Sequence, residues 1–400
     1  MPIRRKVAIT LVALAALAPA ALAIAVVADG GGGTSQPTEA LALHPVAGDF
    51  EPDATTLEDC GEQTCVEQAF GNIAYYQGPK AAIARLEAEI DPDSNACHRI
   101  VHSIGSASLA RYEGNVGRTF AEGASNCFAG YYHGVLERAL VNVRSYRASA
   151  LSAVARGLCV GTQVRAVAEL EYQCLHGLGH GLMITTGYDL PVSLAVCDRL
   201  DGEWEATACE GGAFMENIST SYGVRSRWVR DDDPVFPCDA VREGARRTCY
   251  QLVTSRMLQV LGVAWEEIAE ACGALERQWI RTCFQSFGRD VSGQTHRDPE
   301  EIAAACELAR AYGHELECVR FAAMDMTLNY QRGHEAALLC DEARAGLRAS
   351  CFHAVGTIMG RFRATDSERD ADCRALTRRK DDVAACMRGA RTRLEAAVGE

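Results

Sequence analysis

The spacing of the cysteines is the feature that most restricts how this chain can fold. From residue 159 onward, the cysteines form pairs whose members lie 11 to 15 residues apart. The pairs are Cys159 with Cys174, Cys197 with Cys209, Cys238 with Cys249, Cys272 with Cys283, Cys306 with Cys318, Cys340 with Cys351, and Cys373 with Cys386. The second members of successive pairs are 33 to 40 residues apart, with most intervals close to 34. Each interval holds two stretches of helical hydrophobic spacing, which is typical of stacked helical hairpins.

The cysteine content also indicates the compartment. The chain of 400 residues has 18 cysteines, an even number, and no Cys-x-x-Cys, so zinc-finger and redox motifs lack their usual spacing. We therefore expect disulfides, which form outside the reducing cytosol. A disulfide in each hairpin would join its two helices, and closing a loop of this size is worth about 3 kcal/mol in the chain-entropy model.

The rest of the body is predicted to be helical as well. Apolar residues recur at three- and four-residue spacings over Gln63–Tyr76 and Pro79–Ile90, and alternating strand patterns are scarce. We predict an all-α fold, an α-solenoid of disulfide-clipped helical hairpins behind an N-terminal apolar segment. Residues 56–185 form its N-terminal, histidine-rich part and residues 186–400 its cysteine-paired hairpin repeats.

Four cysteines fall outside the pairing scheme. Cys97 and Cys127 each begin a segment that resembles the second helix of a repeat, but no cysteine stands eleven or so residues before either. We expect them to pair with Cys60 and Cys65. Three connectivities exist for four cysteines, and the sequence does not choose among them.

The N-terminus combines a basic start with a long apolar run. Arg4, Arg5 and Lys6 precede an almost uninterrupted apolar stretch to Ala28. Residues 1–28 are therefore a signal peptide or a single-pass membrane anchor. We favour the anchor, because residues 29–55 begin with four glycines within the first five positions, contain three prolines and have the composition of a flexible linker. Either alternative places the body outside the cytoplasm.

Three cysteine-headed motifs carry candidate metal ligands four residues apart. Residues at this spacing share one helix face, and imidazole with carboxylate suits zinc, copper or iron better than calcium or magnesium. The candidate ligands are His98, His102, His133, Glu137, His176, His180 and, from the next motif, Glu216. We favour His102, His133 and His180. His98 and His176 lie closer to their cysteines, at the more constrained start of each helix.

A packing role for these residues stays open. His353 follows its cysteine by two residues, as His176 does, in a repeat with no second histidine. Some of these histidines would then belong to a repeat consensus. Gly130, Gly177 and Gly212 all stand three residues after a cysteine, where a missing side chain would let helices approach closely.

Composition and motifs narrow the function. The formal net charge of −13 argues against nucleic acid as a partner. No phosphate loop, HExxH or GxSxG is present. We expect an extracytoplasmic, membrane-tethered repeat protein with a His/Glu transition-metal site and a protein partner on its repeat surface. The alternatives are a metal-free interaction scaffold and a metal-dependent hydrolase or oxidoreductase. The chain has four tryptophans, Trp204, Trp228, Trp265 and Trp279. They would serve either as anchors for a partner on the repeat surface or as anchors of the core.

Overall fold

The computed structural model describes residues 50–90, 95–124, 127, 130–141, 143, 145–159, 168–219, 225–363 and 365–392. Within these ranges the chain forms nineteen α-helices and no strand. The all-α prediction is confirmed. The expected N-terminal anchor and most of the expected linker lie outside the described residues. Among the helices that are described, none is long and apolar enough to cross a membrane.

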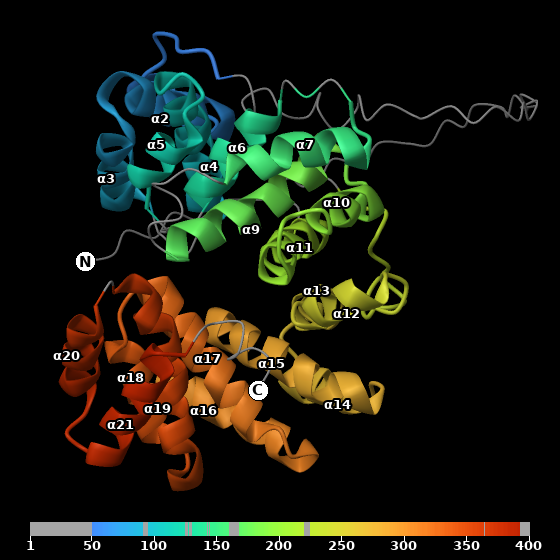
Figure 1. The fold of residues 1–400 in the computed structure, drawn as a ribbon, viewed down its shortest axis with the longest axis vertical. Coiled ribbons are helices and arrows are strands. Elements are labelled where there is room, and N and C mark those ends of the chain that lie inside the picture. Colours follow the sequence, from blue (N-terminus) through green and yellow to red (C-terminus); the bar gives the residue numbers. More distant parts are fainter. Residues whose placement is uncertain are drawn as a thin grey trace, which may run out of the picture. The chain divides into compact units, whose positions relative to one another are not determined.

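One row of helices, most of them long, builds the stack of the repeat (Figure 1). They are α4 (Asn95–Arg111), α6 (Gly130–Leu140), α9 (Ala168–Thr185), α11 (Glu203–Ile218), α12 (Glu243–Tyr250), α15 (Arg277–Gln294), α17 (Glu315–Tyr330), α19 (Ala345–Met359) and α21 (Lys380–Ala390). Each carries the cysteine of its motif except α6, which begins three residues after Cys127. Helices α4, α6, α9 and α11 pack one against the next, as do α15, α17, α19 and α21. Helix α12 packs against both α11 and α15.

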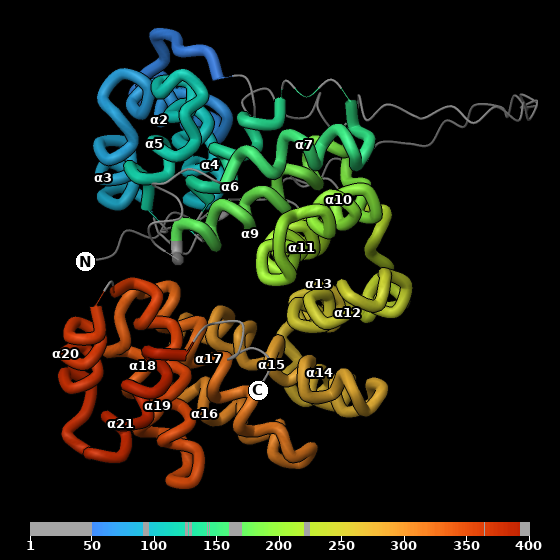
Figure 2. The backbone as a smooth tube through the Cα atoms, viewed as in Figure 1, coloured from blue at the N-terminus to red at the C-terminus, as the bar shows by residue number. Residues whose placement is uncertain are grey.

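The remaining helices connect these or pair with them. They are α2 (Gln63–Gln77), α3 (Pro79–Glu89), α5 (Val116–Ala121), α7 (Ala148–Leu158), α10 (Leu190–Cys197), α13 (Val253–Leu261), α14 (Trp265–Gly273), α16 (Pro299–Leu308), α18 (His334–Glu342) and α20 (Asp366–Leu376). Three 3-10 helices cover Leu57–Asp59, Ala309–Tyr312 and Gly360–Phe362. Figure 2 shows how the chain runs back and forth between short and long helices. The helices predicted at residues 63–76 and 79–90 are found as α2 and α3, each within one residue at its end.

Local signals explain where several helices begin. The Asp298 carboxylate accepts hydrogen bonds from the backbone amides of Glu300 and Glu301, and Pro299 occupies the first helical position of α16. Helix α20 begins with a capping box, in which the Thr365 and Glu368 side chains bond to each other's backbone amides. These caps fix the residues at which α16 and α20 begin.

Seven disulfides join the hairpins at the pairs that the spacing predicts. They are Cys159–Cys174, Cys197–Cys209, Cys238–Cys249, Cys272–Cys283, Cys306–Cys318, Cys340–Cys351 and Cys373–Cys386. All fourteen of these cysteines, including the second members Cys249, Cys283 and Cys351, are buried. Each disulfide therefore lies inside the core, and the predicted pairing is confirmed from residue 159 onward.

The longest interval of the repeat, 40 residues between Cys209 and Cys249, has its own cause. Helices α12 and α13 replace a single long helix in this unit, and a loop precedes them. The extra residues therefore lie outside the packed helices, and the stack continues on either side of them.

The expected pairing of the other four cysteines is wrong. The disulfides are Cys60–Cys65 and Cys97–Cys127, and no cysteine is free. Cys60 and Cys65 bridge the short turn into α2. Cys97 and Cys127 are 30 residues apart, because α4 and the short α5 intervene before the chain returns to the same level of the stack. This separation is at least twice that of the repeat pairs, so the spacing rule missed it.

Glycines allow the long helices to approach closely. A Cβ atom built on Gly179, Gly288 or Gly356 would lie 2.0 to 2.1 Å from the carbonyl oxygen of a cysteine in the next long helix. Each of these glycines stands five residues after the cysteine of its own helix. Since no side chain fits at these three contacts, backbone packs on backbone, and glycine is required at these three positions.

Two large hydrophobic cores run through the stack. One holds residues from Phe50 to Cys209, and the other holds residues from Met183 to Ala390. All four tryptophans pack against these cores and are half-buried. Core anchoring therefore accounts for them better than an exposed binding surface does.

Candidate metal centre

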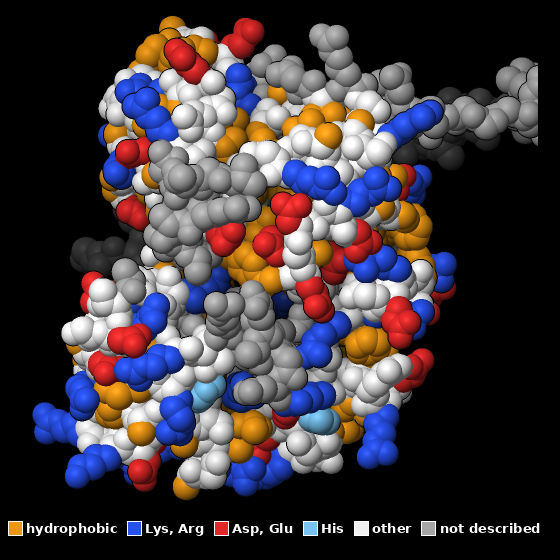
Figure 3. Space-filling view, viewed as in Figure 1, with side chains coloured by type: hydrophobic (Ala, Val, Ile, Leu, Met, Phe, Trp, Pro, Cys, Tyr) orange, Lys and Arg blue, Asp and Glu red, His pale blue; other side chains and the backbone are white. Residues whose placement is uncertain are grey.

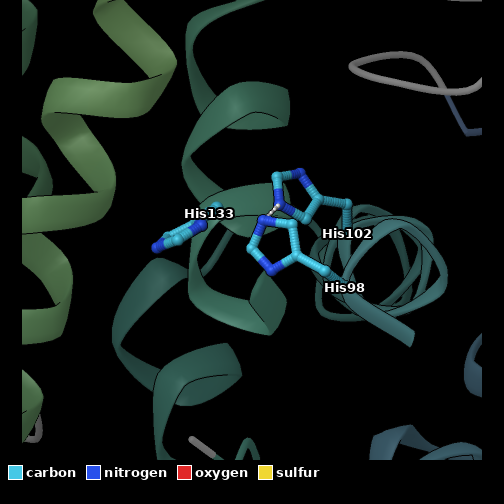
Figure 4. A group of neighbouring side chains, drawn as sticks. All are labelled: His98, His102 and His133. Carbon is cyan, nitrogen blue, oxygen red and sulfur yellow. Dashed lines mark hydrogen bonds between the residues drawn. The ribbon is translucent and has the colours of Figure 1, made fainter. Parts of the chain in front are cut away.

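Three neighbouring long helices bring five histidines together. Helix α4 carries His98 and His102, α6 carries His133, and α9 carries His176 and His180. Helix α6 packs against both α4 and α9, so its single histidine lies between the two pairs. Figure 4 shows the ring of His133 beside the rings of His98 and His102. We call these five residues the histidine cluster.

Close helix packing places the imidazoles within reach of one another. A Cβ atom on Gly134 would lie 1.9 Å from the carbonyl oxygen of His102, and one on Gly212 would lie 1.8 Å from that of His176. On Gly130 it would lie 2.9 Å from the Nδ1 atom of His98. The close approach expected at Gly130 and Gly212 is thus present at the histidine cluster itself. Larger residues would push α6 away from α4 and α11 away from α9, and would displace the imidazoles with them.

The distances within the histidine cluster are short. The Nε2 atoms of His98 and His102 are 3.1 Å apart, and those of His176 and His180 are 3.3 Å apart. The ring centroid of His133 lies 5.3 Å from that of His102 and 4.0 Å from that of His180, whose ring it stacks on. Two overlapping groups result, His98/His102/His133 and His133/His176/His180, and in each the ligand atoms lie within 4.8 Å of one another. Either group could hold a metal ion.

The two glutamates predicted as ligands lie behind histidines instead. Glu137 Oε1 is 2.7 Å from His102 Nδ1, and Glu216 Oε2 is 2.9 Å from His180 Nδ1. Tyr188 donates a hydrogen bond of 2.9 Å to the other oxygen of Glu216. Carboxylates in this position fix the tautomer and the orientation of a metal-binding imidazole and make it more basic. The Nε2 atoms of these histidines are left to face the centre of the histidine cluster.

Hydrogen bonds determine where the protons lie in the first pair. The Nδ1 atom of His98 is 2.9 Å from the carbonyl oxygen of Cys127, which can only accept, so Nδ1 carries a proton. His102 Nδ1 faces the Glu137 carboxylate and also carries one. With His98 neutral, a second proton on His102 would join the two Nε2 atoms, which are 3.1 Å apart.

Burial keeps most of the histidine cluster neutral. Burial, aided by neighbouring imidazoles, holds the pKa values of His133 and His180 well below the usual range. Burial likewise lowers the pKa of His98 and of His176 to about 4. At His102 burial acts in the same direction, but the Glu137 carboxylate outweighs it and the pKa is raised. Neutral imidazoles are the form that binds metal.

His133 is the least satisfied of the five. Its side chain is only 1% exposed, and neither of its ring nitrogens has a hydrogen-bond partner within the described residues. A buried polar group without a partner costs about 1–3 kcal/mol. The other four histidines form two pairs, and the members of each pair contact each other through their Nε2 atoms. His133 is therefore the residue that gains most from a bound cation.

The structure thus brings all five predicted histidines into one cluster and sets both predicted glutamates against it. Sequence reasoning missed Tyr188, which orients Glu216, and Tyr172, whose ring stacks on His176 with centroids 5.4 Å apart. Tyr172 precedes His176 by four residues, so helical spacing was a usable signal for it. Tyr188 lies in the loop after α9, and no spacing rule points to it.

The fold and the histidine cluster define a class, namely a disulfide-stapled α-helical repeat protein with a buried polyhistidine centre. No protein-family model, no curated protein and no solved structure shows significant similarity to the chain.

Proposed function

We propose that this chain is an extracytoplasmic metal-binding protein whose histidine cluster holds transition-metal ions. The observation that carries the proposal is the buried ring of His133, with two nitrogens that find no partner among the described residues, between two histidine pairs. Imidazoles gathered in this number, with carboxylates behind two of them, match the ligand and outer-ligand pattern of known metal sites.

The donor set favours copper or zinc. All eighteen cysteines are in disulfides, so thiolates are not available as ligands. Nitrogen-only sites suit zinc and copper, and copper binds such sites most tightly among the divalent first-row metals. Iron more often takes a carboxylate among its ligands, and here both carboxylates lie behind histidines.

The buried position supports holding a metal rather than acting on a large substrate. His102, His133, His176 and His180 are buried, and His98 is half-buried. A metal-dependent hydrolase needs an open coordination position that a substrate can reach. We therefore propose storage or transfer of the metal as the role, in place of hydrolysis.

The compartment and the tether form the rest of the proposal. Nine intramolecular disulfides suggest a location outside the cytoplasm. Membrane attachment through residues 1–28 rests on the sequence alone. A protein partner on the repeat surface would meet basic and acidic side chains interspersed with one another, as on the face in Figure 3.

Metal content tests the proposal. The full chain, produced in an oxidising compartment, is equilibrated with copper or zinc, freed of loose metal and measured by elemental mass spectrometry. His133→Ala is compared with His353→Ala, which removes a histidine from the repeat consensus outside the cluster. We expect the parent and His353→Ala to retain the metal. We expect His133→Ala to lose it wholly or in part. A folded parent that retains no metal contradicts the proposal and leaves a metal-free scaffold.

A further inference from the structure

We infer that the histidine cluster binds two metal ions, which share His133 through its two ring nitrogens. This inference rests on the proposed metal-binding function and adds the number of ions and the residue that joins them. One ion would lie with His98 and His102 and the other with His176 and His180.

The arrangement of ligands supports two positions rather than one. The two candidate groups have only His133 in common. In a tetrahedral site with metal–nitrogen bonds of about 2.0–2.1 Å, two ligand nitrogens are about 3.3 Å apart. The Nε2 atoms in the two pairs are 3.1 and 3.3 Å apart. Each pair is therefore already spaced to bind its own ion.

The surroundings of the two pairs match each other. In each pair one histidine presents its Nδ1 atom to a buried glutamate, His102 to Glu137 and His180 to Glu216. Each pair is also formed by residues four apart on one helix. Such a duplicated set, on either side of a single imidazole, is what two equivalent metal positions require.

The orientation of His133 allows it to serve both positions. In Figure 4 one ring nitrogen lies on the side of His98 and His102, and the other points away from them. The ring centroids of His176 and His180 lie 5.9 and 4.0 Å from that of His133. Both nitrogens lack partners within the described chain, so neither has to give up a hydrogen bond in order to bind metal.

Sharing the ring changes its protonation but not the oxidation state of any atom. A neutral imidazole has one N–H group and one nitrogen lone pair. When each nitrogen bonds one ion, the N–H bond breaks, its proton passes to the solvent, and the ring becomes an imidazolate with one negative charge. The two ions would be about 6 Å apart, given metal–nitrogen bonds of about 2 Å on each side of the ring.

Copper titration tests the inference on the full chain. Metal-free protein is titrated with copper(II) alone, bound copper is counted by elemental mass spectrometry, and electron paramagnetic resonance records the coupling of the spins. We expect two equivalents of copper and, at full loading, a coupled-spin spectrum whose intensity is well below that of two isolated ions. His353→Ala should behave as the parent does.

Variants separate the two positions. Replacing both His98 and His102 by alanine removes one histidine pair. Copper binding should then fall from two equivalents to one, and the spectrum should be that of an isolated copper(II) ion. His133→Ala should abolish the coupling. Circular dichroism checks the folding of each variant, and the spectrum of the parent decides the matter even if a variant does not fold.

The remaining outcomes are distinguishable. Saturation of the parent at one equivalent overturns the shared site and leaves the proposed metal binding intact. Two equivalents with uncoupled spins overturn the role of His133. No bound copper, with zinc alone also failing to bind, overturns both proposals.

Discussion

Replacing Gly212 by alanine tests whether close helix packing positions the histidine cluster. The new Cβ atom would lie 1.8 Å from the carbonyl oxygen of His176, 2.8 Å from its carbonyl carbon and 3.2 Å from Cδ2 of His180. The obstacle is backbone, which cannot rotate away as a flexible side chain could. Helices α9 and α11 must therefore separate by more than 1 Å, since ordinary contacts begin at about 3.4 Å.

The magnitude follows from two opposing effects. Overpacking of this kind costs about 1–3 kcal/mol, and the upper end applies because whole helices must move. Alanine in place of glycine within a helix returns about 1 kcal/mol. We expect a net loss of about 1–2 kcal/mol in the free energy of unfolding. The displacement of His176 and His180 should also weaken metal binding.

Gly157 provides the matched control. It lies in helix α7 and is exposed, and a Cβ atom built on it meets nothing within 4 Å. Gly157→Ala should therefore raise the free energy of unfolding by about 0.5–1 kcal/mol and leave metal affinity unchanged. The assay is denaturant unfolding of the metal-free chain with its disulfides intact, together with chelator competition for metal affinity. The reasoning would be refuted if the Gly212→Ala variant had the same free energy of unfolding as the Gly157→Ala variant and the metal affinity of the parent.

Three further predictions concern His176, the carboxylate of Glu216 and the disulfide Cys306–Cys318. Burial lowers the pKa of His176 to about 4, so between pH 6.5 and 4 this residue is protonated in the unfolded chain but not in the folded chain. The free energy of unfolding of the metal-free protein should therefore decrease by about 1.4 kcal/mol for each pH unit between 6.5 and 4 because of this residue. His176→Gln should remove that part of the slope in denaturant unfolding across this range. Glu216→Gln should weaken metal binding about 10- to 100-fold in chelator competition, whereas Glu203→Gln, exposed on the same helix, should not. Replacing Cys306 and Cys318 together by alanine should cost about 3 kcal/mol of stability, and a loss below about 1 kcal/mol would show that stacking alone holds that hairpin.

The repeat could be predicted from the sequence because its signals are local. A cysteine pair 11 to 15 residues apart can span one turn between two helices, so the spacing alone identifies the hairpin and its disulfide, as it does for Cys272–Cys283 and Cys340–Cys351. The exception, Cys97–Cys127, requires knowledge of how α4 and α5 fold back. That path depends on tertiary packing, which no cysteine spacing records.

The histidines of the candidate site could also be predicted from the sequence, but the roles of the glutamates could not. Spacing of four residues identified the histidine pairs, and their place in consecutive motifs indicated neighbouring helices. The roles of Glu137 and Glu216 were not predictable, since each carboxylate meets the Nδ1 atom of a histidine on the neighbouring helix and not a ligand position. That distinction depends on rotamers and on helix separations, which the glycines set.

X-ray absorption spectroscopy at the edge of the bound metal tests the central claim most directly. It would be applied to the full chain loaded with copper or zinc and freed of loose metal. The account predicts a first shell of nitrogen at about 2.0 Å with the outer-shell pattern of imidazole and no sulfur at about 2.3 Å. A first shell dominated by sulfur or by oxygen alone, or a folded chain that retains no metal to measure, would contradict it.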